Sequence, residues 1–187
     1  MGSLIVTGLT SLDGYITDDE GDFSWATPDA AVHTFVNGLE RRIGTQLMGR
    51  RMYEVMRFWE TADELPDLPE PEREYAAIWK DTDKVVYSGS LAEVTTERTR
   101  LERRFDADEV RRLVAESADD VSIAGPHLAA HAFHAGIVDE VGMFVHPVIV
   151  GGGTALLPDG VRLELQLLDE HRFDSGVVYL RYAVLRG

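Results

Sequence analysis

The feature that most constrains the fold is a unit that occurs three times: a short apolar run, a Gly or Ser, and then a turn or a helical pattern. The runs end at Met48-Gly49, Ser88-Gly89 and Ala124-Gly125. Strands that alternate with helices are typical of a layered α/β domain with a largely parallel sheet. In such sheets ligands bind beyond the carboxyl ends of strands, where helix N-termini offer free N–H groups to phosphate. The three ends together therefore indicate a nucleotide site, although each glycine alone also suits an ordinary turn.

Hydrophobic periodicity predicts the other elements. Strands are expected at 3–7, 45–48, 84–88 and 121–124, and helices at 28–43, from 50 to 59, around 75–79, at 106–117 and at 126–135. The first helix is expected to be capped by Thr27 and closed by Gly44. Residues 60–74 are typical of a surface loop. Alternation in the last third predicts half-buried strands at 141–145, 163–167 and 177–185, the last two forming an antiparallel hairpin. We expect one α/β domain over residues 1–187, with a mixed, mostly parallel sheet flanked by helices.

Composition excludes several classes of function. The formal net charge is −15, with 18 Lys and Arg against 33 Asp and Glu, so no broad basic face for nucleic acid or an anionic membrane is expected. The chain has no Cys, which excludes disulfides, thiolate nucleophiles, Cys-ligated zinc and iron–sulfur clusters. No basic segment precedes the short apolar run at the N-terminus, and no apolar stretch reaches membrane length. We therefore predict a soluble cytoplasmic protein with a small-molecule ligand.

Four runs of the sequence occur in an order typical of a known family. They are SLDGYI at 11–16, MGRRMYE at 48–54, KVVYS at 84–88, and a segment that extends from VDE at 138–140 to HPVIVGGG at 146–153. With these runs the sequence resembles the dihydrofolate-reductase-like family. Within that family it is most similar to the branch that contains the C-terminal reductase domain of riboflavin-biosynthesis deaminase/reductase proteins. The resemblance covers nearly the whole chain, whereas neither a Gly-x-Gly-x-x-Gly fingerprint nor a Walker loop is present.

The resemblance implies a dihydrofolate-reductase-like three-layer fold and an oxidoreductase that uses NADPH to transfer hydride to a small heterocyclic or carbonyl-type acceptor. The nearest named activity is the aminouracil reductase of riboflavin synthesis. Arg50 and Arg51 would hold cofactor phosphate, because guanidinium groups make bidentate, charge-assisted hydrogen bonds to it and favour NADPH over NADH. Surface arginines in an acidic protein are the competing interpretation. The implied cofactor residues are Gly49, Arg50, Arg51, Met52, Ser88, Gly89, Ala124, Gly125, His127, Gly152 and Gly153.

The resemblance also implies which residues border the reacting atoms. Asp13, in the loop after the first strand, and Glu140, at the start of a later strand, are the candidate catalytic carboxylates, which would supply a proton. Each has a simpler interpretation, since Asp13 and the next Gly form a common turn pair and Glu140 could pair at a strand edge. Tyr15, Trp25 and Tyr53 are the candidate substrate contacts. Trp25 would be either the aromatic wall of a mobile lid or a side chain packed under a loop.

Two residues depart from the pattern of the family, and other interpretations of the function and of the oligomeric state stay open. Tyr15 follows Asp-Gly where riboflavin reductases usually carry Lys, and Pro126 lacks an N–H that a pyrophosphate would use. Histidines at 127, 131 and 134 share a helix face, but no carboxylate motif accompanies them and no metal site is predicted. The alternative function is a nucleotide-binding protein that has lost catalysis and serves in sensing or interaction, and a structural protein without a cofactor is the third. A homodimer through the C-terminal hairpin is expected, although a charged edge strand also suits a monomer.

Overall fold

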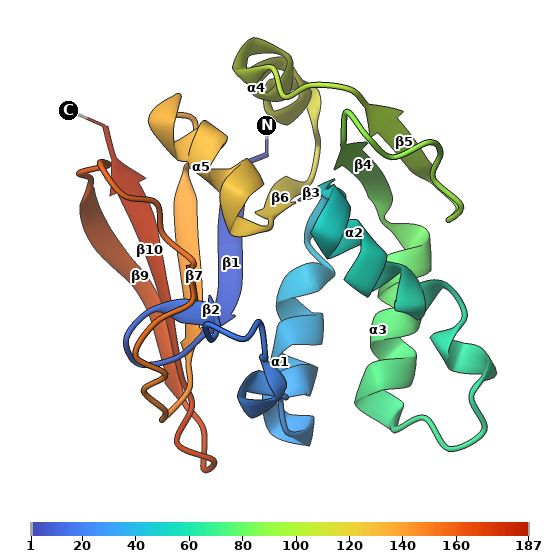
Figure 1. Cartoon of the computed structure of the whole chain (residues 1–187), viewed down its shortest axis with the longest axis vertical. Coiled ribbons are helices and arrows are strands. Elements are labelled where there is room, and N and C mark those ends of the chain that lie inside the picture. Colours follow the sequence, from blue (N-terminus) through green and yellow to red (C-terminus); the bar gives the residue numbers. More distant parts are fainter. Residues whose placement is uncertain (1, 187) are drawn as a thin grey trace.

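The computed structural model describes residues 2–186. Within them one sheet has eight strands in the order β5-β4-β3-β6-β1-β7-β10-β9 (Figure 1). The six strands from β5 to β7 are parallel, whereas β10 pairs antiparallel with both β7 and β9. The predicted mixed sheet with a C-terminal hairpin is confirmed. The strands are β1 (Leu4–Thr10), β3 (Ile43–Gly49), β4 (Asp83–Tyr87), β5 (Thr99–Glu102), β6 (Asp120–Ala124), β7 (Glu140–Val145), β9 (Glu164–Arg172) and β10 (Val178–Leu185).

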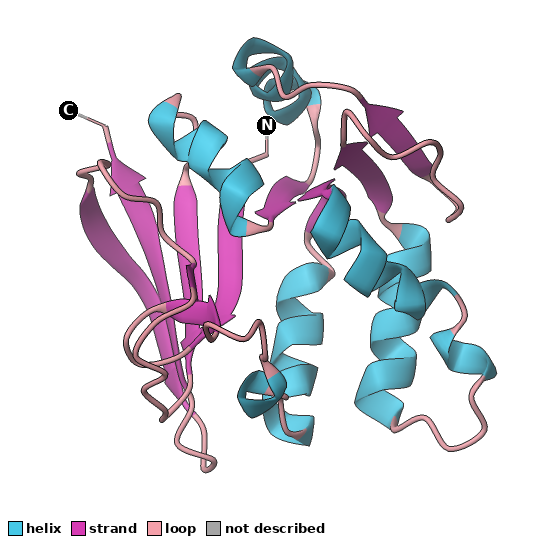
Figure 2. Ribbon diagram, viewed as in Figure 1, coloured by secondary structure: helices cyan, strands magenta, loops and turns pink. Residues whose placement is uncertain are grey.

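Helices cover both faces of the sheet and give three layers (Figure 2). On one face Leu47 and Val85 pack with α4 and α5, and on the other the next residues, Met48 and Val86, pack with α2 and α3. This division follows from the strands, whose successive side chains point to opposite faces. The helices are α1 (Ala30–Glu40), α2 (Arg50–Met56), α3 (Glu70–Asp81), α4 (Ala107–Glu116) and α5 (Pro126–His134), with 3-10 helices η1 (Ser24–Ala26), η2 (Arg57–Glu60) and η3 (Ala62–Glu64).

The loops that leave the strands distinguish one side of the sheet, the side formed by the carboxyl ends of the parallel strands, which we call the carboxyl edge. β6 leads into α5 on one face, whereas its two neighbours, β3 and β1, lead toward α2 and α1 on the other face. The chain therefore leaves neighbouring strands in opposite directions at their carboxyl ends. Such a switch point is where ligands bind in open α/β sheets. The carboxyl edge around β6 is thus the place to look for a functional site.

Three boundaries near the N-terminus differ from the prediction. β1 does not stop at Gly8 but continues to Thr10. α1 is capped by Asp29, whose carboxylate accepts the Val32 N–H at 2.9 Å, and not by Thr27. Gly44 lies inside β3, where a Cβ would approach the Asp119 side chain to 2.9 Å. Gly44 is therefore required by close packing and does not close a helix.

Several elements were not expected from the sequence. α3 begins at Glu70 inside the predicted loop, with a Pro in its first turn. β5 has the polar sequence TRLE, which lacks the apolar alternation of a strand. A second, two-stranded sheet pairs β2 (Tyr15–Thr17) with β8 (Thr154–Ala155). β9 is exposed at all nine residues, so the prediction of a half-buried strand there is wrong. No helix within residues 2–186 has the length and apolar character needed to cross a membrane.

Candidate functional site

Three predicted strand ends lie next to one another at the carboxyl edge. Met48 on β3 pairs with Ala124 on β6, and Gly49 pairs with Tyr87 at the end of β4. The residues that follow these strands therefore come together although they are far apart in the sequence. Gly49 and Gly125 begin helices, and Ser88 begins a loop. The structure brings together the three ends that the sequence singled out.

Gly125 has the backbone conformation that suits a close approach by a ligand. Its φ is +93°, which residues with a side chain rarely adopt, and a Cβ there would lie 3.7 Å from the Cβ of Met52. Gly125 caps α5 without a side-chain hydrogen bond, and Pro126 takes the first helical position. Among the described residues, no side chain accepts the N–H groups of His127 and Leu128 in the first turn. The helix N-terminus at this edge offers both donors and a favourable dipole to an anion.

Arginines gather at the same edge. Arg50 opens α2 and forms an ion pair with Glu54 at 3.0 Å, one turn along the helix. Arg51 is exposed and makes no hydrogen bond or ion pair within the part of the chain that the structure describes. Arg103 and Arg104 follow β5, which ends at the same edge as β4. This concentration of guanidinium groups contrasts with the net charge of −15 of the chain.

The loop after β4 is held by its own hydrogen bonds. The hydroxyl oxygen of Ser88 accepts the N–H groups of Ser90 at 3.3 Å and Leu91 at 2.9 Å. Arg103 donates to the carbonyl oxygens of Ser88 at 3.4 Å and Leu91 at 2.5 Å. A Cβ at Gly89 would have only the Arg103 carbonyl oxygen nearby, at 3.9 Å. The loop is thus shaped in advance, with Gly89 on its open side.

Asp13 fastens two loops to each other. Its carboxylate accepts the N–H groups of Val150 at 3.2 Å and Gly151 at 2.8 Å, and so links the loop after β1 to the loop after β7. The Ser11 hydroxyl, followed by these backbone donors, holds the pKa of Asp13 below its usual value. An exposed carboxyl group with a lowered pKa is ionised near neutral pH. Asp13 lies at the carboxyl edge, but its oxygens accept hydrogen bonds and it is a poor source of a proton.

Glu140 lies at the amino ends of the parallel strands, on the side of the sheet opposite the carboxyl edge. It is the first residue of β7 and pairs with Ile5, whereas Val145 at the far end of β7 pairs with Thr10. At about 3.3 Å per residue, β7 separates Glu140 from the carboxyl edge by roughly 17 Å. Its carboxylate lies 3.8 Å from Arg181. The prediction that Glu140 shares a site with Asp13 is wrong, because a parallel strand carries its first residue at the amino edge.

Two aromatic rings with unpaired nitrogens meet at the end of β7. His146 is only 5% exposed, and its Nε2 has no hydrogen-bond partner in residues 2–186. The indole Nε1 of Trp25 is also buried without a partner, and the two ring centroids lie 6.1 Å apart at 78°. Burial lowers the pKa of His146, and Asp29 opposes this effect only in part. Trp25 is a predicted substrate contact, whereas no local sequence pattern indicates that His146 is buried.

A model of the RibD C-terminal domain family matches residues 3–179. The chain belongs to this family. One relative, the uncharacterized protein YyaP of Bacillus subtilis strain 168, is 27% identical over 183 residues, which span 96% of this chain and 93% of YyaP. The predicted family resemblance is thus confirmed, since the RibD C-terminal domain is the reductase half to which the sequence was most similar.

Solved structures share the fold. A Shewanella sp. PV-4 protein whose name links it to riboflavin biosynthesis has a TM-score of 0.75 at 22% identity, over 98% of this chain and 99% of that one. A pyrimidine reductase-like protein of Corynebacterium diphtheriae has a TM-score of 0.69 at 15% identity, over 100% and 93%. A Thermotoga maritima diaminohydroxyphosphoribosylaminopyrimidine deaminase/5-amino-6-(5-phosphoribosylamino)uracil reductase has a TM-score of 0.67 at 15% identity, and the match covers 98% of this chain but 57% of that protein.

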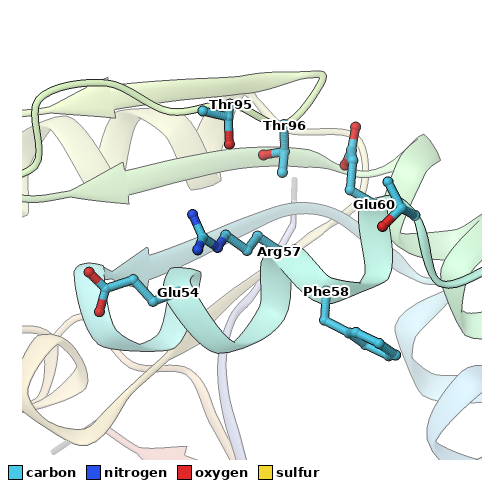
Figure 3. Close-up of a pocket in the computed structure, with 7 residues that line it drawn as sticks. Glu54, Arg57, Phe58, Glu60, Thr95 and Thr96 are labelled. Carbon is cyan, nitrogen blue, oxygen red and sulfur yellow. The ribbon is translucent and has the colours of Figure 1, made fainter.

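In this RibD C-terminal domain, Tyr53 is buried and anchors the loop before β5. The residue is 2% exposed, and its hydroxyl accepts the N–H groups of Thr95 at 2.8 Å and Thr96 at 3.3 Å. Burial raises the pKa of Tyr53, but the hydroxyl groups of Thr95 and Thr96, followed by these N–H groups, together hold the pKa below its usual value. The residue thus has a structural role in holding the loop before β5, and its predicted substrate contact stays a prediction. A cavity of about 410 Å³ lies nearby between α2, η2 and the loop before β5 (Figure 3), lined by Glu54, Arg57, Phe58, Glu60, Thr61, Thr95 and Thr96.

The glycine run of the RibD C-terminal domain is explained by close packing. A Cβ on Gly153 would lie 2.0 Å from the Thr17 carbonyl oxygen, and φ at this residue is +123°. A Cβ on Gly152 would lie 2.8 Å from the Asp19 carboxylate. Both glycines let the loop before β8 lie against the end of β2, where Tyr15 pairs with Ala155. Their predicted cofactor contact stays a prediction, as does the predicted substrate contact of Tyr15.

Proposed function

We propose that this protein is an NADPH-dependent oxidoreductase that transfers hydride to a small heterocyclic or carbonyl-type acceptor. The observation that carries the proposal is the convergence of three strand ends with the exposed Arg50 and Arg51 at one edge of the sheet. Membership of the RibD C-terminal domain family supports a reductase. The nearest named activity is the 5-amino-6-(5-phosphoribosylamino)uracil reductase activity that the Thermotoga maritima protein carries in its name.

The residues at this edge fit NADPH. The N–H groups of His127 and Leu128 would hold the pyrophosphate, where Gly125 leaves room for it. Arg50 and Arg51 would hold the additional phosphate that distinguishes NADPH from NADH. The bound nicotinamide supplies the hydride, so the chain has to bind, orient and shield it from water. The loop at Ser88 and Gly89 would border the adenosine.

Removal of both guanidinium groups is the first test. Arg50→Ala, Arg51→Ala should raise the Kd for NADPH by about 30-fold, since charge-assisted hydrogen bonds contribute about 1.5–3 kcal/mol. The Kd for NADH should change little, because NADH lacks the additional phosphate. Isothermal titration calorimetry with both cofactors measures the two values. Arg57→Ala, which removes an exposed arginine from the next turn, is the matched control, and an unchanged NADPH preference in the double variant would contradict the assignment.

One observation favours a second function, a nucleotide-binding protein without catalysis. Of the two predicted proton-donating carboxylates, Asp13 is held as an acceptor and Glu140 lies at the other edge. A hydride acceptor that needs a proton would have to obtain it from water or from another residue. Acceptor-dependent loss of the NADPH absorbance separates the two functions. A protein that binds NADPH tightly but oxidises it with none of a panel of heterocyclic and carbonyl acceptors would be the binding protein.

We propose a second copy of this chain as the partner that covers β9. β9 is an edge strand, and its Leu165, Leu167 and Leu168 are 43%, 49% and 43% exposed. Unpaired edge strands of this kind attract another strand. An antiparallel pairing of two β9 strands centred on Leu168 would set Glu164 opposite Arg172 at both ends. This charge match and the two-fold symmetry of the pairing favour a homodimer.

A charge on the exposed face of β9 should separate the dimer. Leu167→Asp would place a carboxylate in an apolar contact, and at micromolar protein concentration we expect the mass to fall from that of a dimer to the monomer value of 20.8 kDa. Light scattering after size-exclusion chromatography measures the mass. Leu65→Asp is the control, because Leu65 is 46% exposed but lies in the loop before α3. A monomeric parent protein would contradict the proposal.

A further inference from the structure

Three buried polar atoms near the ends of β1 and β7 lack hydrogen-bond partners. They are Oγ1 of Thr10, Nε1 of Trp25 and Nε2 of His146, considering residues 2–186. Most buried polar atoms in proteins are hydrogen-bonded, and an unpaired one has a cost that calls for an explanation. We consider Trp25 and His146 together, because their rings are neighbours in an edge-to-face arrangement, with centroids 6.1 Å apart and an interplanar angle of 78°. Together they present one donor, the indole N–H, and one imidazole nitrogen.

The backbone of His146 is held at the carboxyl edge. Its backbone N–H donates to the Thr10 carbonyl oxygen at 2.7 Å, and its carbonyl oxygen accepts the Val148 N–H at 2.8 Å. Asp29, the cap of α1, is the charged group that acts on the ring. Burial lowers the pKa of His146, so the ring is neutral near pH 7 and one of its nitrogens can accept a hydrogen bond. Within residues 2–186, Nε2 takes part in no hydrogen bond or ion pair.

The segment that carries Trp25 makes its hydrogen bonds within itself and makes none to the main sheet in the described chain. Within the described chain, residues 19–26 make their hydrogen bonds only with residues 18–27, chiefly around the Asp18 and Asp22 carboxylates. Residues 18–24 belong to the exposed or half-exposed surface. A unit of this kind can shift without breaking hydrogen bonds to the sheet. Because Trp25 belongs to this unit, a small movement of the unit would expose Nε2 of His146 while the indole N–H stays beside it.

We propose that His146 is a substrate-contacting residue whose Nε2, with the indole Nε1 of Trp25, binds the adjacent polar atoms of a ring amide. The indole N–H donates to the carbonyl oxygen, and Nε2 accepts from the neighbouring ring N–H. A simple aldehyde or ketone satisfies only one of the two groups and leaves the other unpaired. The role of this contact in hydride transfer rests on the proposed function, but binding of the ring amide does not require NADPH.

The test titrates the full chain with 5,6-diaminouracil, a ring amide, and follows the indole N–H and imidazole signals by NMR. The signals of Trp25, assigned with Trp25→Phe, and of His146 should shift and saturate, whereas those of Trp59 and Trp79 should not. The analogue 5,6-diamino-1,3-dimethyluracil has no ring N–H and should bind about tenfold more weakly. Absence of a shift, or equal affinity for the two uracils, overturns the proposal.

Two variants of His146 test the contact itself. Glutamine reaches as far as Nε2, whereas asparagine ends near Nδ1, so His146→Gln should keep the Kd for 5,6-diaminouracil within about threefold and His146→Asn should raise it about tenfold. In His146→Asn the two uracils should bind alike. An equal effect of both variants, with unfolding temperatures as in the parent, overturns the proposal.

The outcomes also separate this inference from the proposed function. If NADPH does not bind while the NMR signals shift, the proposed function fails and the ring-amide site stands. If NADPH is oxidised and no signal shifts, only this inference fails.

Discussion

Replacement of Lys84 by methionine is expected to lower the free energy of unfolding by about 3 kcal/mol. Lys84 is 1% exposed, yet its ammonium group donates to the carbonyl oxygens of Trp79 at 2.7 Å and Thr82 at 2.8 Å. These carbonyls belong to the C-terminal end of α3, where the last turn of a helix lacks donors of its own. The ammonium also lies 4.8 Å from the centre of the Trp79 ring. The Lys84 side chain therefore provides hydrogen-bond donors to the carbonyl groups at the end of α3, and its positive charge interacts favourably with the negative end of the helix dipole.

Methionine preserves most of the volume of Lys84 but removes the donors, so two buried carbonyl groups lose their partners. Burial lowers the pKa of Lys84, which shows that the charge is held in a poorly solvated place. Urea denaturation at neutral pH measures the change. Lys80→Met is the control, because Lys80 is a half-exposed residue of α3 paired with Asp63, and little effect is expected. Similar small effects for the two variants would show that Lys84 does not stabilise the end of α3.

Lys84 also illustrates how far the sequence predicts the fold. The run that begins with it predicts a strand, and that prediction is confirmed as β4. The parallel strands and the C-terminal hairpin are predictable because apolar alternation and turn residues are local signals. β5 was missed because it is a polar edge strand. The burial of a lysine under a helix end depends on α3 and β4 meeting, which no local pattern contains.

The site was predictable where strand direction alone decides it. Gly49 ends one parallel strand, and Ser88 and Gly125 follow two others, so the sheet brings them to one edge. The same reasoning places Glu140, at the start of β7, at the amino ends of the parallel strands, so its position away from Asp13 is also predictable from the sequence. Tyr53 lies on the buried side of α2, which helical periodicity only outlines. His146 was missed because an unpaired nitrogen is a property of the packed structure and not of the residue type.

A single methyl group at Gly125 should weaken NADPH binding by about 100-fold, equivalent to about 2.7 kcal/mol. Gly125 has a φ of +93°, so alanine strains the backbone and tends to rotate the peptide that precedes α5. Rotation would turn the first N–H groups of α5 away from the pyrophosphate, and the Cβ itself would occupy the approach beside Met52. Isothermal titration calorimetry of Gly125→Ala measures the loss.

Gly136→Ala separates loss of binding from loss of stability. Gly136 follows the other end of α5, has a φ of +63°, and has no atom within 4 Å of its would-be Cβ. Alanine there carries a similar backbone strain of about 1–2 kcal/mol, so the two variants should unfold at similar temperatures. Only Gly125→Ala should lose the cofactor, because only Gly125 lies at the carboxyl edge. Equal NADPH affinities in the two variants would mean that the strand end of β6 does not hold the pyrophosphate, and the proposed cofactor site would have to be abandoned.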